Sequence, residues 1–160
     1  MYIETSWPRR PGDNARLNSP ILRSTSSNCY LRFYYHMKGS HIGSLLVRTR
    51  TSYYVGGLSN PILNITGPQG DFWYRGLVQA PYSQNDYQFV IEGVRGNGYQ
   101  GDIAIDDVSL TPGCQICKDC TMPGKIAGIL LFASRFIFLV AFLFSAFWLP
   151  KKLKDYFWLP

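Results

Sequence analysis

Apolar and polar residues alternate along several short segments of the first 115 residues, which is the period of a β-strand with one buried face. The longest such segment, residues 30–38, has an apolar side of Leu31, Phe33, Tyr35 and Met37 and a second side of Arg32, Tyr34, His36 and Lys38. One buried and one solvated face suits a layer of a two-layer sandwich. The second side, rich in Arg, Tyr and His, is a candidate contact surface. Trp73 lies between Phe72 and Tyr74, and we expect it in the core.

Residues 87–114 predict two more strands and the turn between them. The first strand has Tyr87, Phe89 and Ile91 on one side, and glycines at 93, 96, 98 and 101 predict a turn that uses positive φ angles. In the second strand the apolar phase moves from Ile103 and Ile105 to Val108 and Leu110, across Asp106 and Asp107. This phase shift predicts a β-bulge at the two aspartates.

A continuous apolar run begins at residue 126 and predicts a membrane span. Residues 126–149 hold a single charge, Arg135, and about 20 apolar residues cross a bilayer as a helix. Arg135 costs about 2.5–3.5 kcal/mol on insertion scales, which the other residues outweigh. Lysines at 151, 152 and 154 then predict a cytoplasmic C-terminus with residues 1–125 outside. The opening residues, MYIETSWPRRPGDNAR, contain no apolar leader.

Four blocks of the sequence resemble successive blocks of the MAM domain, the extracellular module of meprins, neuropilins and receptor tyrosine phosphatases. They are PGDNARLNSPIL at 11–22, CYLRFYYHMKGSHIGSLLV at 29–47, NITGPQGDFW at 64–73, and IEGVRG at 91–96 followed by GDIAIDDVSLTPGC at 101–114. Leu63 stands where the family usually has a tryptophan, and Met1 falls inside the module. We therefore expect the first strands of the module and an N-terminal cysteine pair to be absent, as in a fragment, a splice product or a gene-model artefact.

The resemblance implies a fold, a function and a disulfide. The fold is an all-β, jelly-roll-like antiparallel β-sandwich over residues 1–115, followed by a cysteine-bearing stalk at 116–125, the span at 126–149 and a basic and aromatic tail at 150–160. The function is adhesion or receptor-type recognition of protein partners at the cell surface, including contacts between copies of the chain. The alternative is an accessory module that anchors a larger surface receptor or protease. The disulfide joins Cys29 to Cys114.

For Cys117 and Cys120 the sequence is compatible with several chemical states. They are spaced as a CxxC pair, which can chelate zinc, but a structural zinc site needs four ligands and the sequence offers no second pair. A disulfide with each other, a bond to another chain and palmitoylation of Cys120 are the alternatives.

Two further modification or binding sites are predicted. Asn64-Ile65-Thr66 is an N-glycosylation sequon before a glycine- and proline-rich turn. Asp106 and Asp107 are candidate ligands of a structural Ca²⁺, which needs six to eight oxygens. The alternative is that Asp102 caps a turn and one aspartate of the pair accepts backbone N–H groups at the bulge.

Composition excludes other classes of function. The net charge of +6 divides evenly between residues 1–125 and 126–160, and no basic stripe predicts nucleic-acid binding. His36, His41 and Ser40 lie near one another in the chain, but neither a GxSxG turn nor an HExxH helix accompanies them. Glu92 opposite an aspartate could form an acid–base pair, but nothing in the sequence places the two in a pocket. We therefore expect no enzyme activity, no small-molecule substrate and no cofactor apart from the Ca²⁺ considered above.

Overall fold

The structure, a computed structural model, describes residues 1–23, 28–51 and 57–120. Within these residues it contains eight β-strands. They are β1 (Tyr2–Ile3), β2 (Asn14–Asn18), β3 (Tyr30–Met37), β4 (Ser44–Arg50), β5 (Leu63–Thr66), β6 (Tyr74–Gln79), β7 (Gln88–Val94) and β8 (Ile103–Leu110).

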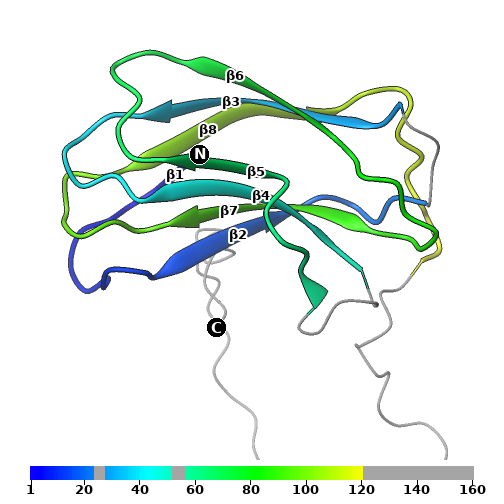
Figure 1. Ribbon diagram of the computed structural model, residues 1–160, viewed down its shortest axis with the longest axis horizontal. Helices are drawn as coiled ribbons and strands as arrows, with labels where there is room; N and C mark the ends of the chain where they lie inside the picture. The colour runs from blue at the N-terminus through cyan, green and yellow to red at the C-terminus, as the bar shows by residue number, and fades with distance from the viewer. Residues whose placement is uncertain (24–27, 52–56, 121–160) are drawn as a thin grey trace, which may run out of the picture. The chain divides into compact units, whose positions relative to one another are not determined.

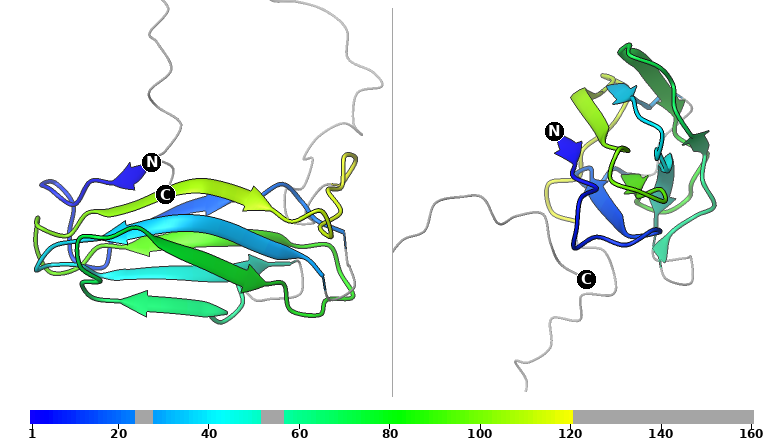
Figure 2. Two further views of the ribbon diagram at one scale, coloured as in Figure 1. Left: turned by 90° about the horizontal axis from the view of Figure 1, so that it is seen from above. Right: turned by 90° about the vertical axis from the view of Figure 1, so that its left-hand side faces the viewer.

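The strands form two four-stranded sheets that stack face to face, as Figures 1 and 2 show. Sheet A has the order β1-β8-β3-β6, sheet B has the order β2-β7-β4-β5, and every pairing is antiparallel. The predicted all-β antiparallel sandwich is confirmed. Within the described residues no helix is long and apolar enough to span a membrane, and the span expected at 126–149 lies outside them.

The core lies between the two sheets and follows the predicted alternation. The apolar side of residues 30–38 faces inward: Leu31, Phe33 and Met37 are at most 2% exposed, and Tyr35 packs against them. Strand β7 adds Phe89 and Ile91, and β4 adds Leu45 and Val47. The sequence pattern therefore determined which side of β3 is buried, because successive side chains of a strand point to opposite faces.

The bulge predicted at the two aspartates is confirmed. Along β3 the pairing steps from Arg32 to Tyr34, while along β8 it steps from Ser109 to Asp106, so β8 carries one extra residue. Asp107 lies in the left-handed region with φ 49°, and its N–H donates to Asp106 Oδ1 at 2.9 Å. After this shift Leu110 packs against the core, whereas Val108 is 41% exposed.

The glycines of the β7–β8 turn serve a different purpose from the predicted one. None of Gly93, Gly96, Gly98 and Gly101 has a positive φ. Instead the turn packs closely against residues 41–43, and a Cβ added at Gly96 or Gly101 would overlap the His41 carbonyl oxygen. The prediction of positive φ is wrong because close backbone approach, which local sequence does not report, selects glycine here.

Sheet B carries a buried ion-pair cluster on its outer face. Glu92 in β7 is only 3% exposed. Its Oε1 accepts from Arg16 Nε of β2 at 2.9 Å, and its Oε2 accepts from Arg48 Nε of β4 at 2.8 Å. Arg48 Nη1 also donates to the Ser59 carbonyl at 2.9 Å. Glu92 therefore ties the central strand to both of its neighbours.

Candidate functional site

A disulfide joins the start of β3 to the segment that follows β8. Cys29 and Cys114 are bonded with Cα atoms 4.5 Å apart, and Cys29 is fully buried. Thr111 Oγ1 accepts from the Tyr30 N–H at 2.9 Å, and the Thr111 N–H donates to the Tyr30 carbonyl at 3.0 Å. This bridge encloses 85 residues of sequence and holds the end of the domain against its core.

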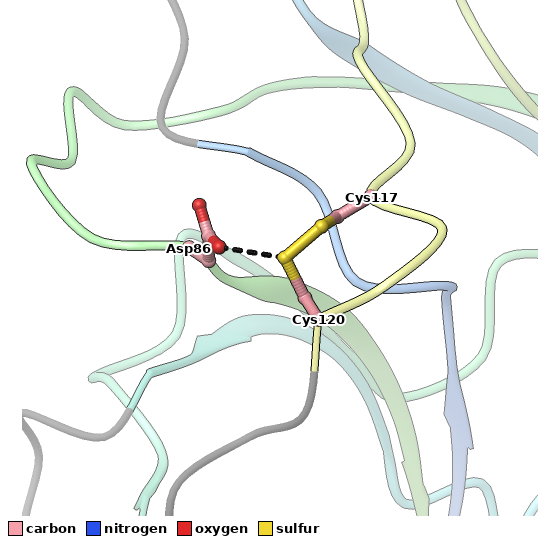
Figure 3. Close-up of side chains that lie close together, drawn as sticks. All are labelled: Asp86, Cys117 and Cys120. Carbon is pink, nitrogen blue, oxygen red and sulfur yellow. Dashed lines mark hydrogen bonds between the residues drawn. A yellow bond between two sulfur atoms is a disulfide. The ribbon is translucent and has the colours of Figure 1, made fainter.

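The last described residues form a second small loop, closed by a disulfide between Cys117 and Cys120 with Cα atoms 5.5 Å apart. Figure 3 shows Asp86, from the loop before β7, pointing at this bond, with Oδ2 3.0 Å from Cys120 Sγ. The two sulfur atoms and a carboxylate oxygen lie within 4.8 Å of one another. Sequence reasoning missed Asp86, because 31 residues separate it from Cys117 and no motif links the two.

The aspartates of the predicted calcium site lie apart from this cluster. Asp106 and Asp107 are exposed at the bulge of β8, and within the described residues no third Asp, Glu, His or Cys joins them in a metal-sized group. Asp102 instead accepts from the Thr5 N–H at 3.1 Å and from Thr5 Oγ1 at 2.9 Å. Asp102 therefore holds the N-terminal segment, which differs from the turn cap considered for it. Asp106 accepts the Asp107 N–H at the bulge, as considered, and calcium binding stays a prediction.

The glycosylation sequon lies in β5, an edge strand of sheet B. Asn64 and Thr66 are exposed, while Ile65 between them packs against the core. Thr66 Oγ1 donates to Asn64 Oδ1 at 3.0 Å. Because Asn64 pairs with Leu46, it shares the outer face of sheet B with the Glu92 cluster. A glycan here would cover that face and leave the opposite one open.

The outer face of sheet A carries exposed aromatic and cationic side chains in rows across its strands. One row runs Tyr2, Ala104, His36, the next runs Asp106, Tyr34, Arg75, and the third runs Ser109, Arg32, Leu77. Tyr2 is 63% exposed, Tyr34 41% and Leu77 53%. Within the described residues neither Arg32 nor Arg75 makes an ion pair. We call Tyr2, Arg32, Tyr34, His36, Trp73, Arg75 and Leu77 the sheet A face.

Trp73 belongs to this face and not to the core. Its side chain is 51% exposed and its ring centroid lies 5.4 Å from that of His36. The prediction was wrong because Gly76 and Val78 mark the buried side of β6, and Phe33 fills the space below Gly76. Trp73 lies three positions before Gly76, so strand alternation puts it on the opposite, outward side.

A charged group borders Trp73. Asp71 Oδ2 accepts from Lys38 Nζ at 2.6 Å, and Asp71 Oδ1 lies 3.0 Å from His36 Nε2. Lys38, and after it His36, hold the pKa of the Asp71 carboxyl below its ordinary value. This arrangement fixes the imidazole under the indole ring and leaves both rings partly accessible.

The residues considered for a nucleophilic triad make other contacts. Ser40 Oγ donates to Gln100 Oε1 at 2.9 Å, and His41 Nδ1 accepts from the Gln100 N–H at 3.3 Å. His36 lies beside Asp71 instead of beside Ser40. These contacts hold two loops together and do not align a serine with a base.

Comparison with known proteins agrees with this architecture. The family profile described as MAM domain, meprin/A5/mu, matches residues 1–118. The rat protein named MAM domain-containing glycosylphosphatidylinositol anchor protein 1 is 41% identical over 153 residues, covering 88% of this chain and 16% of the relative. Human MAM domain-containing glycosylphosphatidylinositol anchor protein 2 is 38% identical, and the match covers 80% of this chain and 14% of the relative. Zebrafish (Danio rerio) neuropilin-1a is 37% identical, and the match covers 69% of this chain and 12% of the relative.

The chain therefore spans between about an eighth and a sixth of the length of these relatives. The profile, in contrast, covers well over half of the chain, and the matched residues include all eight strands of the sandwich. The protein is accordingly a member of the MAM domain family.

Proposed function

We propose that this domain is a non-catalytic recognition module that binds a protein partner at the cell surface through the sheet A face. The observation that carries the proposal is the exposure of Tyr34, Trp73 and Leu77 on one continuous sheet surface. Tyr, Trp and Arg are the residues that most often dominate the binding energy of protein interfaces. The family resemblance implies that the partner is another protein or a second copy of this chain.

The contrast between the two outer faces supports this choice. On sheet B the charged residues satisfy one another, since Glu92 takes hydrogen bonds from Arg16 and Arg48. On sheet A the guanidinium of Arg75 is exposed, and Arg32 Nε is buried without an acceptor among the described residues. A carboxylate of a partner would supply an acceptor for the exposed guanidinium of Arg75.

Two cavities among the described residues bear on whether the domain could be catalytic. One cavity, of about 350 Å³, is lined by Thr49, Thr51 and residues 81–85 and 87. Another, of about 370 Å³, is lined by residues 17–20 and 108–110 together with Leu31, Phe89, Ile91 and Ile116. Neither lining contains a His, Cys, Asp, Glu or Lys, and the general acid or base candidates that they do contain are Tyr82 and Tyr87 of the first cavity.

The test compares two charge reversals on the full chain displayed on cells. Displayed cells are incubated with an array of receptor ectodomains that includes the chain itself. We expect Arg75→Glu to weaken binding of a captured partner by about 30-fold, since interface hot spots contribute about 2 kcal/mol. Arg10→Glu reverses an exposed arginine outside the sheet A face and should leave binding unchanged. Absence of any captured partner, or equal binding by both variants, would refute the proposal.

We also propose that residues 126–149 anchor the domain, with residues 1–125 outside the cell and the C-terminus in the cytosol. The names of the rat and human relatives state a glycosylphosphatidylinositol anchor, which is the rival form of attachment. Phosphatidylinositol-specific phospholipase C releases a lipid-anchored chain and leaves a membrane-spanning one in place. Release by carbonate at alkaline pH would contradict both forms of attachment.

Asn64 is proposed to carry an N-linked glycan, and the Cys29–Cys114 disulfide is proposed to form in the extracellular domain. Glycosidase treatment should shift the mass of the surface protein, and Asn64→Gln should abolish that shift. Asn28→Gln, at an asparagine outside any sequon, should keep it. Nonreducing peptide mapping that finds Cys29 as a free thiol would contradict the disulfide.

A second candidate function is that of an accessory module that anchors a larger receptor or protease. The observation that favours it is the small share of each relative that this chain spans. Sequencing complete transcripts that contain this coding region distinguishes the two, because the accessory role requires further extracellular domains upstream.

A further inference from the structure

The described residues contain one group of three metal-ligating side chains whose ligand atoms lie within 4.8 Å of one another: Asp86, Cys117 and Cys120. Cys117 is 7% exposed, and Asp86 and Cys120 are half-buried. The carboxylate comes from the loop before β7 and the sulfurs from the end of the domain, as Figure 3 shows. The fold thus adds a third ligand to a CxxC pair that has only two in the sequence.

The chemistry of these ligands suits zinc better than a hard cation. Zinc binds cysteine thiolates at about 2.3 Å and aspartate oxygens at about 2.0–2.2 Å in tetrahedral geometry, which sets neighbouring ligand atoms roughly 3.5–3.8 Å apart. Thiolates disfavour calcium and magnesium. Three protein ligands leave the fourth position to water, as in open zinc sites.

We propose that Asp86, Cys117 and Cys120 form a redox-gated zinc site, closed as the disulfide and able to bind Zn²⁺ after reduction. A dithiol reductant breaks the Sγ–Sγ bond and becomes a disulfide itself, and each cysteine gains one proton. Zn²⁺ then displaces those two protons and binds both thiolates, with Asp86 as the third ligand. Each disulfide has one buried and one half-buried cysteine, and Cys29, which is 0% exposed, is less accessible than Cys117, which is 7% exposed.

Backbone contacts hold the ligands in place independently of the disulfide. Leu22 bridges to Ile116 on one side and to Tyr87 on the other. The Cys117 N–H donates to the Ile21 carbonyl at 2.8 Å, and the Tyr87 N–H, next to Asp86, donates to the Leu22 carbonyl at 2.9 Å. Opening the disulfide therefore leaves Cys117 and Asp86 on the same backbone frame.

The test uses Co²⁺ as a spectroscopic substitute for zinc on the full chain in detergent micelles. The chain is reduced until peptide mapping finds Cys117 and Cys120 alkylatable and the Cys29–Cys114 bond intact, and the reductant is then removed without air. We expect a thiolate-to-cobalt charge-transfer band on titration, and its loss when Zn²⁺ is added. The oxidised chain should show no such band.

Two matched variants identify the third ligand. Asp86→Asn should weaken Co²⁺ binding by at least about tenfold. Even the mutation of a residue that only hydrogen-bonds a metal ligand lowers metal affinity by about 10–100-fold. Asp119→Asn changes the exposed carboxylate between the two cysteines and should leave affinity unchanged. The proposal is overturned if no band forms, if Asp86→Asn binds as tightly as the native chain, or if near-ultraviolet circular dichroism shows that reduction unfolds the domain.

Discussion

Replacing Glu92 with glutamine tests whether the ion-pair cluster of sheet B stabilises the domain. Glu92 is 3% exposed, and each carboxylate oxygen accepts from one arginine, Arg16 or Arg48. Glutamine keeps the shape, but its amide nitrogen must face one guanidinium, donor against donor. A charged hydrogen bond contributes about 1.5–3 kcal/mol, and a buried charge that loses its partner adds to that loss. We therefore expect Glu92→Gln to cost about 3 kcal/mol in the free energy of unfolding.

The two arginines should contribute unequally. The Arg48 side chain is 22% exposed and also donates to the Ser59 carbonyl, whereas the Arg16 side chain is 38% exposed. Water replaces a lost partner more readily at the more exposed site. Methionine keeps most of the aliphatic stem of each arginine. We expect Arg48→Met to cost about 2 kcal/mol and Arg16→Met about 1 kcal/mol.

Thermal unfolding of the full chain in detergent, followed by near-ultraviolet circular dichroism, measures all three variants. At about 4 °C per kcal/mol for a domain of this size, Tm should fall by about 12, 8 and 4 °C for the Glu92, Arg48 and Arg16 variants. The double variant of Glu92 and Arg48 should cost less than the sum of the two, because they share one hydrogen bond. A Glu92→Gln shift below about 4 °C, or equal shifts for the two arginines, would refute the reasoning.

Two other predictions concern the loops and the sheet A face. Gly96→Ala should cost about 3 kcal/mol, because its Cβ overlaps the His41 carbonyl. Gly67→Ala should lower the free energy of unfolding by only about 1 kcal/mol, because Gly67 has a φ of 77° but an added Cβ would meet open space. Equal losses for the two variants in denaturant unfolding would contradict this. Lys38→Ala should raise the pKa of Asp71 toward its ordinary value, measured by carboxyl carbon NMR. Because the folded pKa is lowered, Asp71 contributes stability above its unfolded pKa and loses it as pH falls through the folded value. If the titration midpoint of the Asp71 carboxyl is the same in Lys38→Ala as in the native chain, the Lys38 contact does not lower the Asp71 pKa.

The sequence by itself determined the features that depend on neighbours in the chain. The period of two fixed the buried side of β3, since consecutive strand residues must face opposite ways. The phase shift at Asp106 and Asp107 located the bulge for the same reason, because an extra residue inverts the alternation. The order of four sequence blocks was enough to indicate the family.

Tertiary structure alone decided the features that depend on which segments become neighbours. Glu92 is buried because Arg16 and Arg48, 76 and 44 residues away, arrive on either side of it. Asp86 meets Cys120 only because Leu22 bridges both segments of backbone. Trp73 points outward because Phe33 already fills the interior at Gly76. Strand pairing across long loops sets these contacts, and no local pattern of residues encodes it.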